Sequence, residues 1–277
     1  MRAEWDAAAA GWYAHGAAIH EWLREPTEAM LSMAGVVPGA RVLDVAAGAG
    51  DQTLAIAERV GPTGYVLATD LSPAILALAS SHAERAGCAR VETRVADGES
   101  LGVSEGSFDA AICRLGLMFF PDPLRGLCEI ARALRPGGGL CTLVFSRPEA
   151  NPCLTILMST ALRHAGLPPR DPHQPGALMS LSRPGHIDDL FHQAGFRHVA
   201  TTAVDAVFRL PSVDDYLEFV RHSAAPVMEI LARLDAAAAE AAWAEMRERL
   251  RVFETASGWA GPNELLLTAG RRSEDAP

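Results

Sequence analysis

Lysine is missing from all 277 residues, so each of the 24 basic side chains is an arginine. This absence excludes a Schiff-base lysine, a catalytic lysine base and the lysine of a P-loop. Acidic side chains number 34, which gives a formal net charge of −10 at pH 7. A general nucleic-acid binder needs a basic face, so we expect no nucleic-acid partner.

Long apolar runs and paired cysteines are also missing. No stretch of 18 apolar residues occurs, so we expect no membrane span. The amino-terminal residues carry charges and aromatic rings, unlike a secretory signal. The five cysteines form no C-x-x-C pair, which argues against a zinc site or a disulfide framework; they are Cys88, Cys113, Cys128, Cys141 and Cys153. We therefore expect a cytoplasmic protein with reduced thiols and no metal.

The hydrophobic pattern alternates between strands and helices. Residues 1–34 are expected to be helical, with Trp5, Trp12, Ile19, Trp22 and Leu23 on one face. Strands are predicted within 37–46 and at 65–70, 89–97, 108–114, 140–146, 197–209 and 264–272. Helices are predicted at 51–60, 72–87, 122–134, 186–196 and through most of 212–256. This order predicts an α/β fold whose seven-stranded, mostly parallel sheet has helices on both faces and a helical cover.

Five segments follow from this pattern. Residues 1–34 form an amino-terminal helical segment, and 35–147 form the core of the sheet. Residues 148–211 form a lid or substrate segment with the sixth strand; its proline-rich stretch, "GLPPRDPHQPG", is typical of a loop. Residues 212–260 form the helical cover, inserted before the last strand and tail at 261–277.

The stretch "VLDVAAGAGDQT" joins the first predicted strand to the next helix. Glycine lets the backbone approach a ligand closely, and free N–H groups at a helix start favour anionic groups. A dinucleotide loop would read G-x-G-x-x-G, but Thr53 takes the third glycine position and Asp51 adds negative charge. The ligand is therefore expected to differ from a dinucleotide.

Acidic residues follow the neighbouring strands as well. Asp70 ends the second strand, 20 residues after Gly50, where a carboxylate can accept hydrogen bonds from ribose hydroxyls. Asp97 ends the third strand and could accept a hydrogen bond from an adenine amino group. Arg114 and Leu115 follow the fourth strand and face the same crevice. A ribose, an adenine and an amino acid together describe S-adenosylmethionine.

Four motifs in register resemble those of the class I S-adenosylmethionine-dependent methyltransferases, in particular the branch of the ubiquinone and menaquinone biosynthesis enzymes. They are "VLDVAAGAG", "ATDLSPAIL", "VADGESL" and "FDAAICRLGLMFFPDP…ALRPGGGL", within residues 40–147. The resemblance implies a Rossmann-like fold, S-adenosyl-L-methionine as cofactor and S-adenosyl-L-homocysteine as product. One departure is Ala46, where the family usually has its first glycine.

The resemblance also implies which residues bind the cofactor. Asp44 and the backbone of Ala46, Ala47, Gly48 and Gly50 would support the methionine portion, with Gln52 and Thr53 within reach of its carboxylate. Asp70 would hold the ribose, Leu71 would pack on adenine, and Asp97 and Gly98 would meet the adenine edge. Arg114 or Leu115 would lie near the methionine amine or sulfonium. The predicted site further includes Ser72, Glu99, Trp12 and Tyr13, the last two from an aromatic segment that folds over the cofactor or simply packs in the core.

The acceptor is expected to be a small, partly apolar molecule, because residues 148–184 and 212–260 are rich in Leu, Met and Phe. The catalytic residue and the methylated atom stay open, as does a homodimer. His15, His20, His164, His173, His186 and His222 lie in segments that could line a substrate pocket, whereas His82, His192 and His198 are expected at the surface or partly packed. A non-catalytic S-adenosylmethionine-binding protein and an NAD-dependent oxidoreductase are the alternatives.

Overall fold

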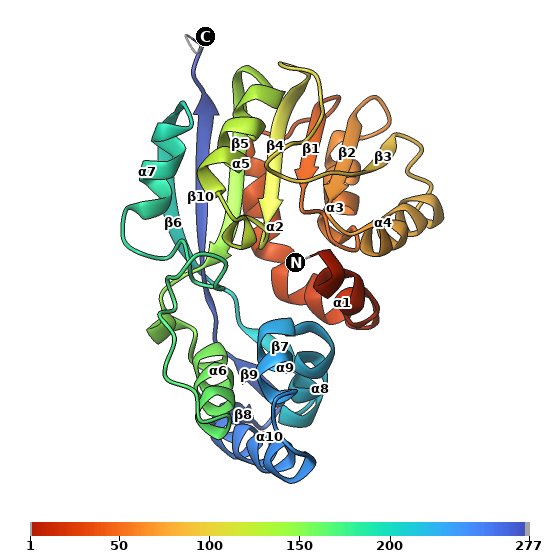
Figure 1. Ribbon diagram of the computed structural model, residues 1–277. Coiled ribbons are helices and arrows are strands. Elements are labelled where there is room, and N and C mark those ends of the chain that lie inside the picture. Colours follow the sequence, from red (N-terminus) through yellow and green to blue (C-terminus); the bar gives the residue numbers. More distant parts are fainter. Residues whose placement is uncertain (1, 275–277) are drawn as a thin grey trace.

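A twisted seven-stranded sheet runs through the computed structural model, which describes residues 2–274 (Figure 1). Its strand order is β3-β2-β1-β4-β5-β10-β6. The strands are β1 (Arg41–Val45), β2 (Tyr65–Asp70), β3 (Val91–Val95), β4 (Phe108–Arg114), β5 (Leu134–Phe145), β6 (Phe196–Asp205) and β10 (Glu264–Arg272). Only β10 pairs antiparallel with its neighbours, β5 and β6. The fold is Rossmann-like, as predicted.

Helices cover both faces of this sheet. One face carries α2 (Gly16–Ala34), α3 (Asp51–Val60) and α4 (Pro73–Arg85), which contact the strands from β3 across to β10. The other face carries α5 (Pro123–Ala133) and α7 (His186–Gln193), which contact each other as well as the sheet. The inner strands β1 and β4 are therefore almost completely buried, which accounts for their mainly apolar sequences.

The helical cover lies beyond one end of the sheet (Figure 1). It contains α8 (Val213–Ser223), α9 (Ala225–Leu231) and α10 (Ala236–Leu250), and α6 (Pro152–His164), from the segment before it, packs on α9 and α10. Three short 3-10 turns complete the list of helical elements: η1 (Leu117–Phe119), η2 (Pro148–Ala150) and η3 (Arg251–Phe253). The Ala-rich α10 is held by a few large apolar side chains, since Trp243, Met246 and Leu250 are all buried. Ser212 and Asp235 cap α8 and α10.

A second, three-stranded sheet was not predicted. It is made of β7 (Phe208–Leu210), β9 (Gly258–Gly261) and β8 (Glu254–Thr255), in that order. The predicted strand at 197–209 was therefore wrong as a single element, because the chain leaves the large sheet after Asp205 and joins the small one at Phe208. Trp259 anchors the small sheet: its ring stacks on Tyr216 at 4.1 Å and its indole N–H donates to the Leu250 carbonyl at 2.9 Å.

The amino-terminal helix α1 (Arg2–Ala14) lies between the large sheet and the helical cover (Figure 1). It contacts α4 on one side and α8 on the other. Gly11 allows the second contact, because a Cβ atom there would lie 2.2 Å from the backbone oxygen of His222. This close approach accounts for a glycine inside a helix, where it otherwise costs stability.

No helix among residues 2–274 is long and apolar enough to cross a membrane. In the same range, no three side chains of His, Cys, Asp or Glu are placed to hold a metal ion together.

Replacing Gly11 with alanine should loosen the contact between α1 and α8. The added methyl group has no room against His222, and such overpacking typically costs about 1–3 kcal/mol. Gly16→Ala is the matched control, because a Cβ there meets no atom within 4 Å. We expect urea denaturation to give Gly11→Ala a free energy of unfolding about 1–3 kcal/mol below that of Gly16→Ala. Equal stabilities would contradict the close packing.

Candidate functional site

A cavity of about 520 Å³ lies at the carboxyl ends of the central strands. Its walls include residues 45–49 from the last residue of β1 onward, residues 69–71 at the end of β2, residues 96–98 after β3 and residues 114–116 from the last residue of β4 onward. The strand order reverses between β1 and β4. Open parallel sheets bind their ligands outside the carboxyl ends of the strands at this point. We call this space the first cavity.

The loop after β1 is held from behind by a buried carboxylate. Asp44 is 0% exposed, and its two oxygens accept hydrogen bonds from Gln52 Nε2 at 3.0 Å and Thr53 Oγ1 at 2.6 Å. Burial raises the pKa of Asp44 to about 6, although both hydrogen bonds and the nearby Arg114 charge oppose the rise. The Asp44 carboxylate thus links the end of β1 to the first turn of α3 and fixes the conformation of the loop between them.

Two residues without the freedom of glycine adopt left-handed backbone at this site. Ala46 has φ of 56° and Leu115 has φ of 55°, and the two lie in loops that face each other across the β1–β4 boundary. Left-handed backbone costs roughly 1–2 kcal/mol for such residues. Gly116 provides the space for the Ala46 methyl group, since a Cβ on Gly116 would lie 2.4 Å from it. Alanine therefore fits where the resembling family usually has glycine.

Gly48 and Gly50 serve different purposes in the same loop. Both have positive φ, 56° and 91°. A Cβ on Gly50 would lie 2.9 Å from Ala79, so this glycine lets the start of α3 approach α4. A Cβ on Gly48 would meet no atom within 4 Å, and Gly48 borders the cavity. The open space at Gly48 forms a cradle that only a residue without a side chain leaves free for a ligand.

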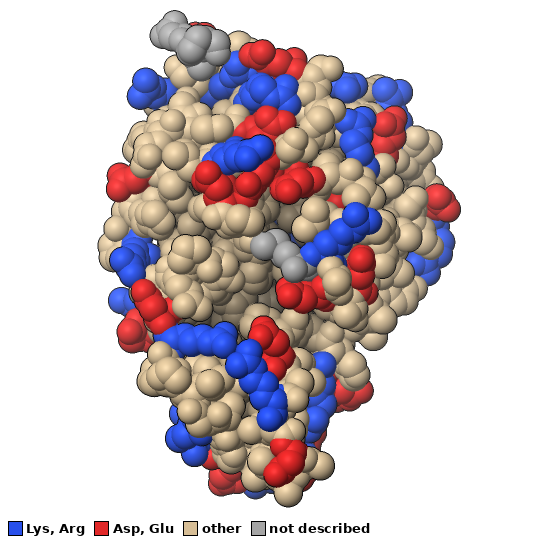
Figure 2. Space-filling view, in the orientation of Figure 1, with Lys and Arg blue, Asp and Glu red and all other residues tan. Residues whose placement is uncertain are grey.

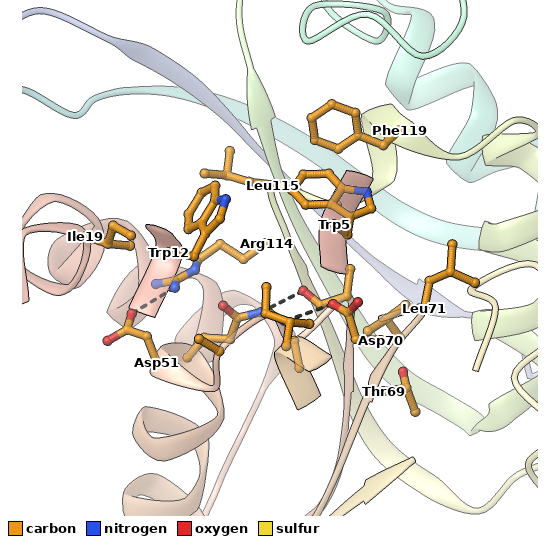
Figure 3. A pocket seen from close by; sticks show the side chains of 18 of the residues that line it. Trp5, Trp12, Ile19, Asp51, Thr69, Asp70, Leu71, Arg114, Leu115 and Phe119 are labelled. Atoms are coloured by element: carbon orange, nitrogen blue, oxygen red, sulfur yellow. Dashed lines mark hydrogen bonds and ion pairs between the residues drawn. The ribbon is translucent and has the colours of Figure 1, made fainter. Parts of the chain in front are cut away.

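The Asp70 carboxylate projects from the end of β2 into the cavity wall (Figure 3). One oxygen accepts a hydrogen bond from the Gly48 N–H at 3.0 Å and the other accepts from the Ser72 N–H at 2.9 Å. Burial raises the pKa of Asp70, and these backbone hydrogen bonds oppose the rise. Each oxygen keeps one lone pair. Asp70 can therefore accept two further hydrogen bonds from a ligand with neighbouring hydroxyl groups.

Asp97 and Gly98 form the far wall, beyond β3. Asp97 accepts a hydrogen bond from the Glu99 N–H at 2.9 Å, which turns the chain sharply. Gly98 is packed under the Phe120 ring, because a Cβ there would lie 2.1 Å from it. Leu71 and Phe120 also line the cavity. This wall combines apolar surface with one carboxylate.

An ion pair closes the end of the cavity opposite Asp97. Arg114 Nη2 lies 2.8 Å from Asp51 Oδ2 (Figure 3), and its other terminal nitrogen donates to Thr27 Oγ1 at 2.8 Å. The second Asp51 oxygen lies 2.7 Å from His20 Nδ1. Arg114 is only 8% exposed, so the guanidinium is held in one orientation. Both signs of charge therefore face the cavity within a few ångströms of each other.

Helix α1 covers the cavity with aromatic rings. Trp5 packs edge-to-face on Phe119 with centroids 5.1 Å apart, and Tyr13 stacks on His82 at 5.2 Å. The His82 ring in turn bonds the Ala49 carbonyl through Nδ1 at 2.9 Å. Trp12 lies over the Arg114 side of the cavity (Figure 3). The roof of the cavity is thus supplied by α1 and α4.

Comparison with known sequences identifies the family to which the chain belongs. Residues 17–160, more than half of its length, match the model of the ubiE/COQ5 methyltransferase family. The chain belongs to the ubiE/COQ5 methyltransferase family. It is 37% identical over 131 residues to the ubiquinone/menaquinone biosynthesis C-methyltransferase UbiE of Ectopseudomonas mendocina. That match covers 47% of this chain and 51% of the relative, so the chain spans about half the length of the curated relatives it matches.

Two solved structures share the fold over almost the whole chain. The YcgJ protein of Bacillus subtilis superposes with a TM-score of 0.60 at 19% identity, covering 91% of this chain and 99% of its own. Phosphoethanolamine N-methyltransferase 2 of Haemonchus contortus, solved with phosphomonomethylethanolamine and S-adenosylhomocysteine, superposes with a TM-score of 0.56 at 18% identity. It covers 90% of this chain and 52% of its own. At these identities the likeness extends to the fold alone.

The family region contains most of the predicted site residues, and the structure brings the majority of them together. Those that line the first cavity are Ala46, Ala47, Gly48, Gln52, Asp70, Leu71, Asp97, Gly98, Arg114 and Leu115, joined by Trp12 and Tyr13 from α1. Asp44, Gly50, Thr53, Ser72 and Glu99 lie outside the lining. Ser72 caps α4, accepting from the Ile75 N–H at 3.1 Å. Asp44 and Thr53 bond each other behind the loop.

Sequence reasoning missed several residues of this cavity. The negative charge of Asp51 was used only as an argument against a dinucleotide, and its pairing with Arg114 was not predicted. Trp5 was expected on an apolar helix face, yet it lines the cavity. His82 lines the cavity as well, whereas of the six histidines expected near a pocket only His20 lines the first cavity. The aromatic spacing of residues 5, 12 and 13 was the available signal.

The raised pKa of Asp44 has a measurable consequence for stability. An acid whose pKa is higher in the folded state binds more protons there, so the free energy of unfolding falls as the pH rises through the window between about 4 and 6. The total loss is about 3 kcal/mol, at 1.36 kcal/mol per pKa unit. Asp44→Asn removes this component. We therefore expect the free energy of unfolding of Asp44→Asn, relative to that of the parent protein, to rise by about 3 kcal/mol from pH 4 to pH 7.

Urea denaturation of both proteins across this pH range measures the effect, and the comparison of slopes cancels any constant cost of the substitution. Parallel pH profiles would show that the Asp44 carboxylate does not titrate in this window. They would then place its charge in a better solvated setting than the structure describes.

Proposed function

We propose that this protein is an S-adenosylmethionine-dependent methyltransferase that acts on a small, partly apolar acceptor by in-line methyl transfer. The observation that carries the proposal is the first cavity, where Asp70, Asp97 and Arg114 lie at or just beyond the ends of β2, β3 and β4, and Asp51 at the start of α3 pairs with Arg114. Membership of the ubiE/COQ5 methyltransferase family supports the same activity.

The residues of the cavity fit S-adenosylmethionine part by part. Asp70, with two lone pairs left, is suited to accept from both ribose hydroxyls. Leu71 and the wall at Asp97 and Gly98 suit the adenine ring and its amino group. Asp51 and Arg114 suit the amino acid end, because its ammonium and carboxylate groups match their two charges. Gly48 leaves the space that the chain between these ends requires.

The dinucleotide alternative fits the same cavity less well. Thr53 occupies the third glycine position, and its hydroxyl is bonded to the buried Asp44. Asp51 places a carboxylate at the start of α3, where a pyrophosphate would need free N–H groups. The cofactor cavity alone is equally compatible with a non-catalytic S-adenosylmethionine-binding protein, which a screen of small acceptors for S-adenosylhomocysteine release would distinguish.

The catalytic contribution of this chain is expected to be positioning. When bound, the cofactor supplies an electrophilic methyl group on a positively charged sulfur. Alignment of the reacting atoms can contribute about 7–11 kcal/mol. Trp5, Leu115 and Phe119 form the apolar end of the cavity and keep water from it. A general base is needed only for an acceptor that retains its proton near neutral pH.

The proposal includes a small-molecule partner and a cytoplasmic location. Charges of both signs are scattered over the face shown in Figure 2, and no continuous basic surface forms there. The net charge of −10 also disfavours a polyanionic partner. Cys113, Cys141 and Cys153 are buried as free thiols, which suits a reducing compartment.

Asp70→Asn should weaken binding of S-adenosylhomocysteine by about 1–3 kcal/mol, because one strong acceptor of ribose hydroxyls is lost. Asp214→Asn makes the same chemical change on α8, where the carboxylate pairs with Arg247 outside the first cavity. We expect that control to bind like the parent protein in isothermal titration calorimetry. Binding of NAD in place of S-adenosylhomocysteine would overturn the proposed cofactor.

Asp51→Asn should act on the amino acid end alone. We expect weaker binding of S-adenosylhomocysteine, by about 1–3 kcal/mol for one charged hydrogen bond, and unchanged binding of 5′-methylthioadenosine, which has no amino acid end. Asp70→Asn should weaken both ligands, because both carry the ribose. Equal losses for the two ligands in Asp51→Asn would contradict the orientation proposed here.

A further inference from the structure

Strand β3 forms one edge of the large sheet (Figure 1). It pairs with β2 on one side, and no strand within residues 2–274 pairs with it on the other. Its sequence is "VETRV"; none of its residues is fully buried, and Val95 is 48% exposed. The open edge of a sheet presents N–H and C=O groups that can pair with a strand of another chain.

The backbone groups that face outward from β3 can be assigned. On the side of β2, the Arg90 carbonyl accepts a hydrogen bond from the Val66 N–H, and the Ala96 N–H donates to the Asp70 carbonyl, both at 3.0 Å. Along a strand, the backbone groups of successive residues point to alternate sides. The even-numbered residues therefore face β2, and the odd-numbered residues of β3 face outward.

The side chains of β3 are arranged symmetrically about Thr93. Val91 and Val95 lie two positions to either side of it, and Glu92 and Arg94 are its immediate neighbours, with opposite charges. Suppose that two copies of this strand run antiparallel with Thr93 opposite Thr93. Each valine then faces a valine, and each Glu92 faces an Arg94. A twofold axis through the Thr93 pair relates the two copies.

The backbone of β3 fits the same register. Thr93 faces outward, so its two copies form a hydrogen-bonded pair that exchanges both N–H···O=C bonds. The Val95 N–H of each copy meets the Val91 carbonyl of the other, whereas the Val91 N–H already donates to the Cys88 carbonyl of its own chain at 3.2 Å. Glu92 and Arg94 fall in the non-hydrogen-bonded pairs, in which the side chains lie closest.

Both charged side chains can form an ion pair across this contact, because both are exposed. Glu92 accepts a hydrogen bond from the Tyr65 hydroxyl at 2.8 Å, and Arg94 donates to the Gly102 carbonyl at 3.3 Å. Each of these bonds uses one terminal atom. The other carboxylate oxygen and the other terminal nitrogen are left to pair with a second copy.

Other ways of pairing β3 with itself bring like charges together. A shift of the antiparallel register by two residues places Glu92 opposite Glu92, or Arg94 opposite Arg94, depending on its direction. A parallel arrangement in register places both like pairs side by side. Like charges directly opposite each other destabilise a pair of strands. The charges of β3 therefore favour the single register centred on Thr93.

The strand at the opposite edge of the sheet, β6, is irregular. His198 has φ of 53°, and the register with β10 shifts beside it, between Ala269 and Arg271. Such a bulge interrupts the row of backbone groups and is one way in which proteins protect an edge. Of the two edges, β3 is therefore the one suited to pairing.

We propose that β3 is a self-association surface, which pairs antiparallel with β3 of a second copy of this chain through ion pairs between Glu92 of one copy and Arg94 of the other. The two large sheets then form one continuous sheet across the contact. No residue of β3 lines the first cavity, so this inference does not depend on the proposed function.

Charge reversal tests the register. Sedimentation velocity of the full chain over a wide range of concentrations should show a monomer–dimer equilibrium for the parent protein. Glu92→Arg and Arg94→Glu should each raise the dissociation constant about tenfold or more, because each places like charges opposite each other. High salt should weaken the parent dimer, because it screens the ion pairs.

An equimolar mixture of the two variants should restore association to within about threefold of the parent protein. One variant then carries two arginines at these positions and the other two glutamates, so both ion pairs form between unlike copies. The double variant Glu92→Arg/Arg94→Glu should associate with itself for the same reason. Arg197→Glu is the matched control, because it reverses the charge of an exposed arginine on β6. It should dissociate like the parent protein.

Three results would overturn the proposal. They are a parent protein that stays monomeric at every concentration, a dimer that the single variants leave intact, and a dimer that Arg197→Glu disrupts as strongly. Folded single variants that fail to associate on mixing would overturn the pairing of Glu92 with Arg94. Circular dichroism checks the folding of each variant, and Glu92→Lys with Arg94→Asp repeats the exchange if one of them does not fold.

Discussion

A carboxylate buried at the end of the central strand organises the site. Asp44 lies between β2 and β4, where all contact with water is lost, and its charge is met only by Gln52, Thr53 and the more distant Arg114. Because such a group is costly without partners, the first turn of α3 has to come back to it. These contacts restrict the conformation of the loop between β1 and α3, in which Ala46, Gly48 and Gly50 have left-handed backbone. The cradle at Gly48 is a consequence of that constraint.

Much of this arrangement could be predicted from the sequence, because it depends on periodicity and on where strands end. The acidic residues at the ends of β1, β2 and β3 follow one rule, that parallel strands finish at the same edge, and the structure brings Asp70 and Asp97 to one cavity. Asp44 follows the same rule but lies behind the loop, where Gln52 and Thr53 donate hydrogen bonds to its carboxylate. Capping residues such as Ser72 also act locally, within a few positions of the helix they start.

What could not be predicted depends on contacts between distant segments. The small sheet pairs Phe208–Leu210 with residues about fifty positions later, and three-residue strands leave no periodic signal. Asp51 and Arg114 lie far apart in the sequence, so no local pattern predicted that they form an ion pair. The cover of the first cavity by α1 depends on a close approach to α8 at Gly11, which in sequence is only an unfavourable residue inside a helix. Such features become visible only when the elements are packed.

Helix α1 has a thermodynamic consequence for molecules bound beside it. Trp5 and Trp12 line both the first cavity and an adjoining cavity of about 500 Å³ on the side of the helical cover. Two molecules bound in these cavities would therefore contact the same helix. Any coupling between their affinities through α1 would be reciprocal: the factor by which the first molecule tightens the second equals the factor by which the second tightens the first.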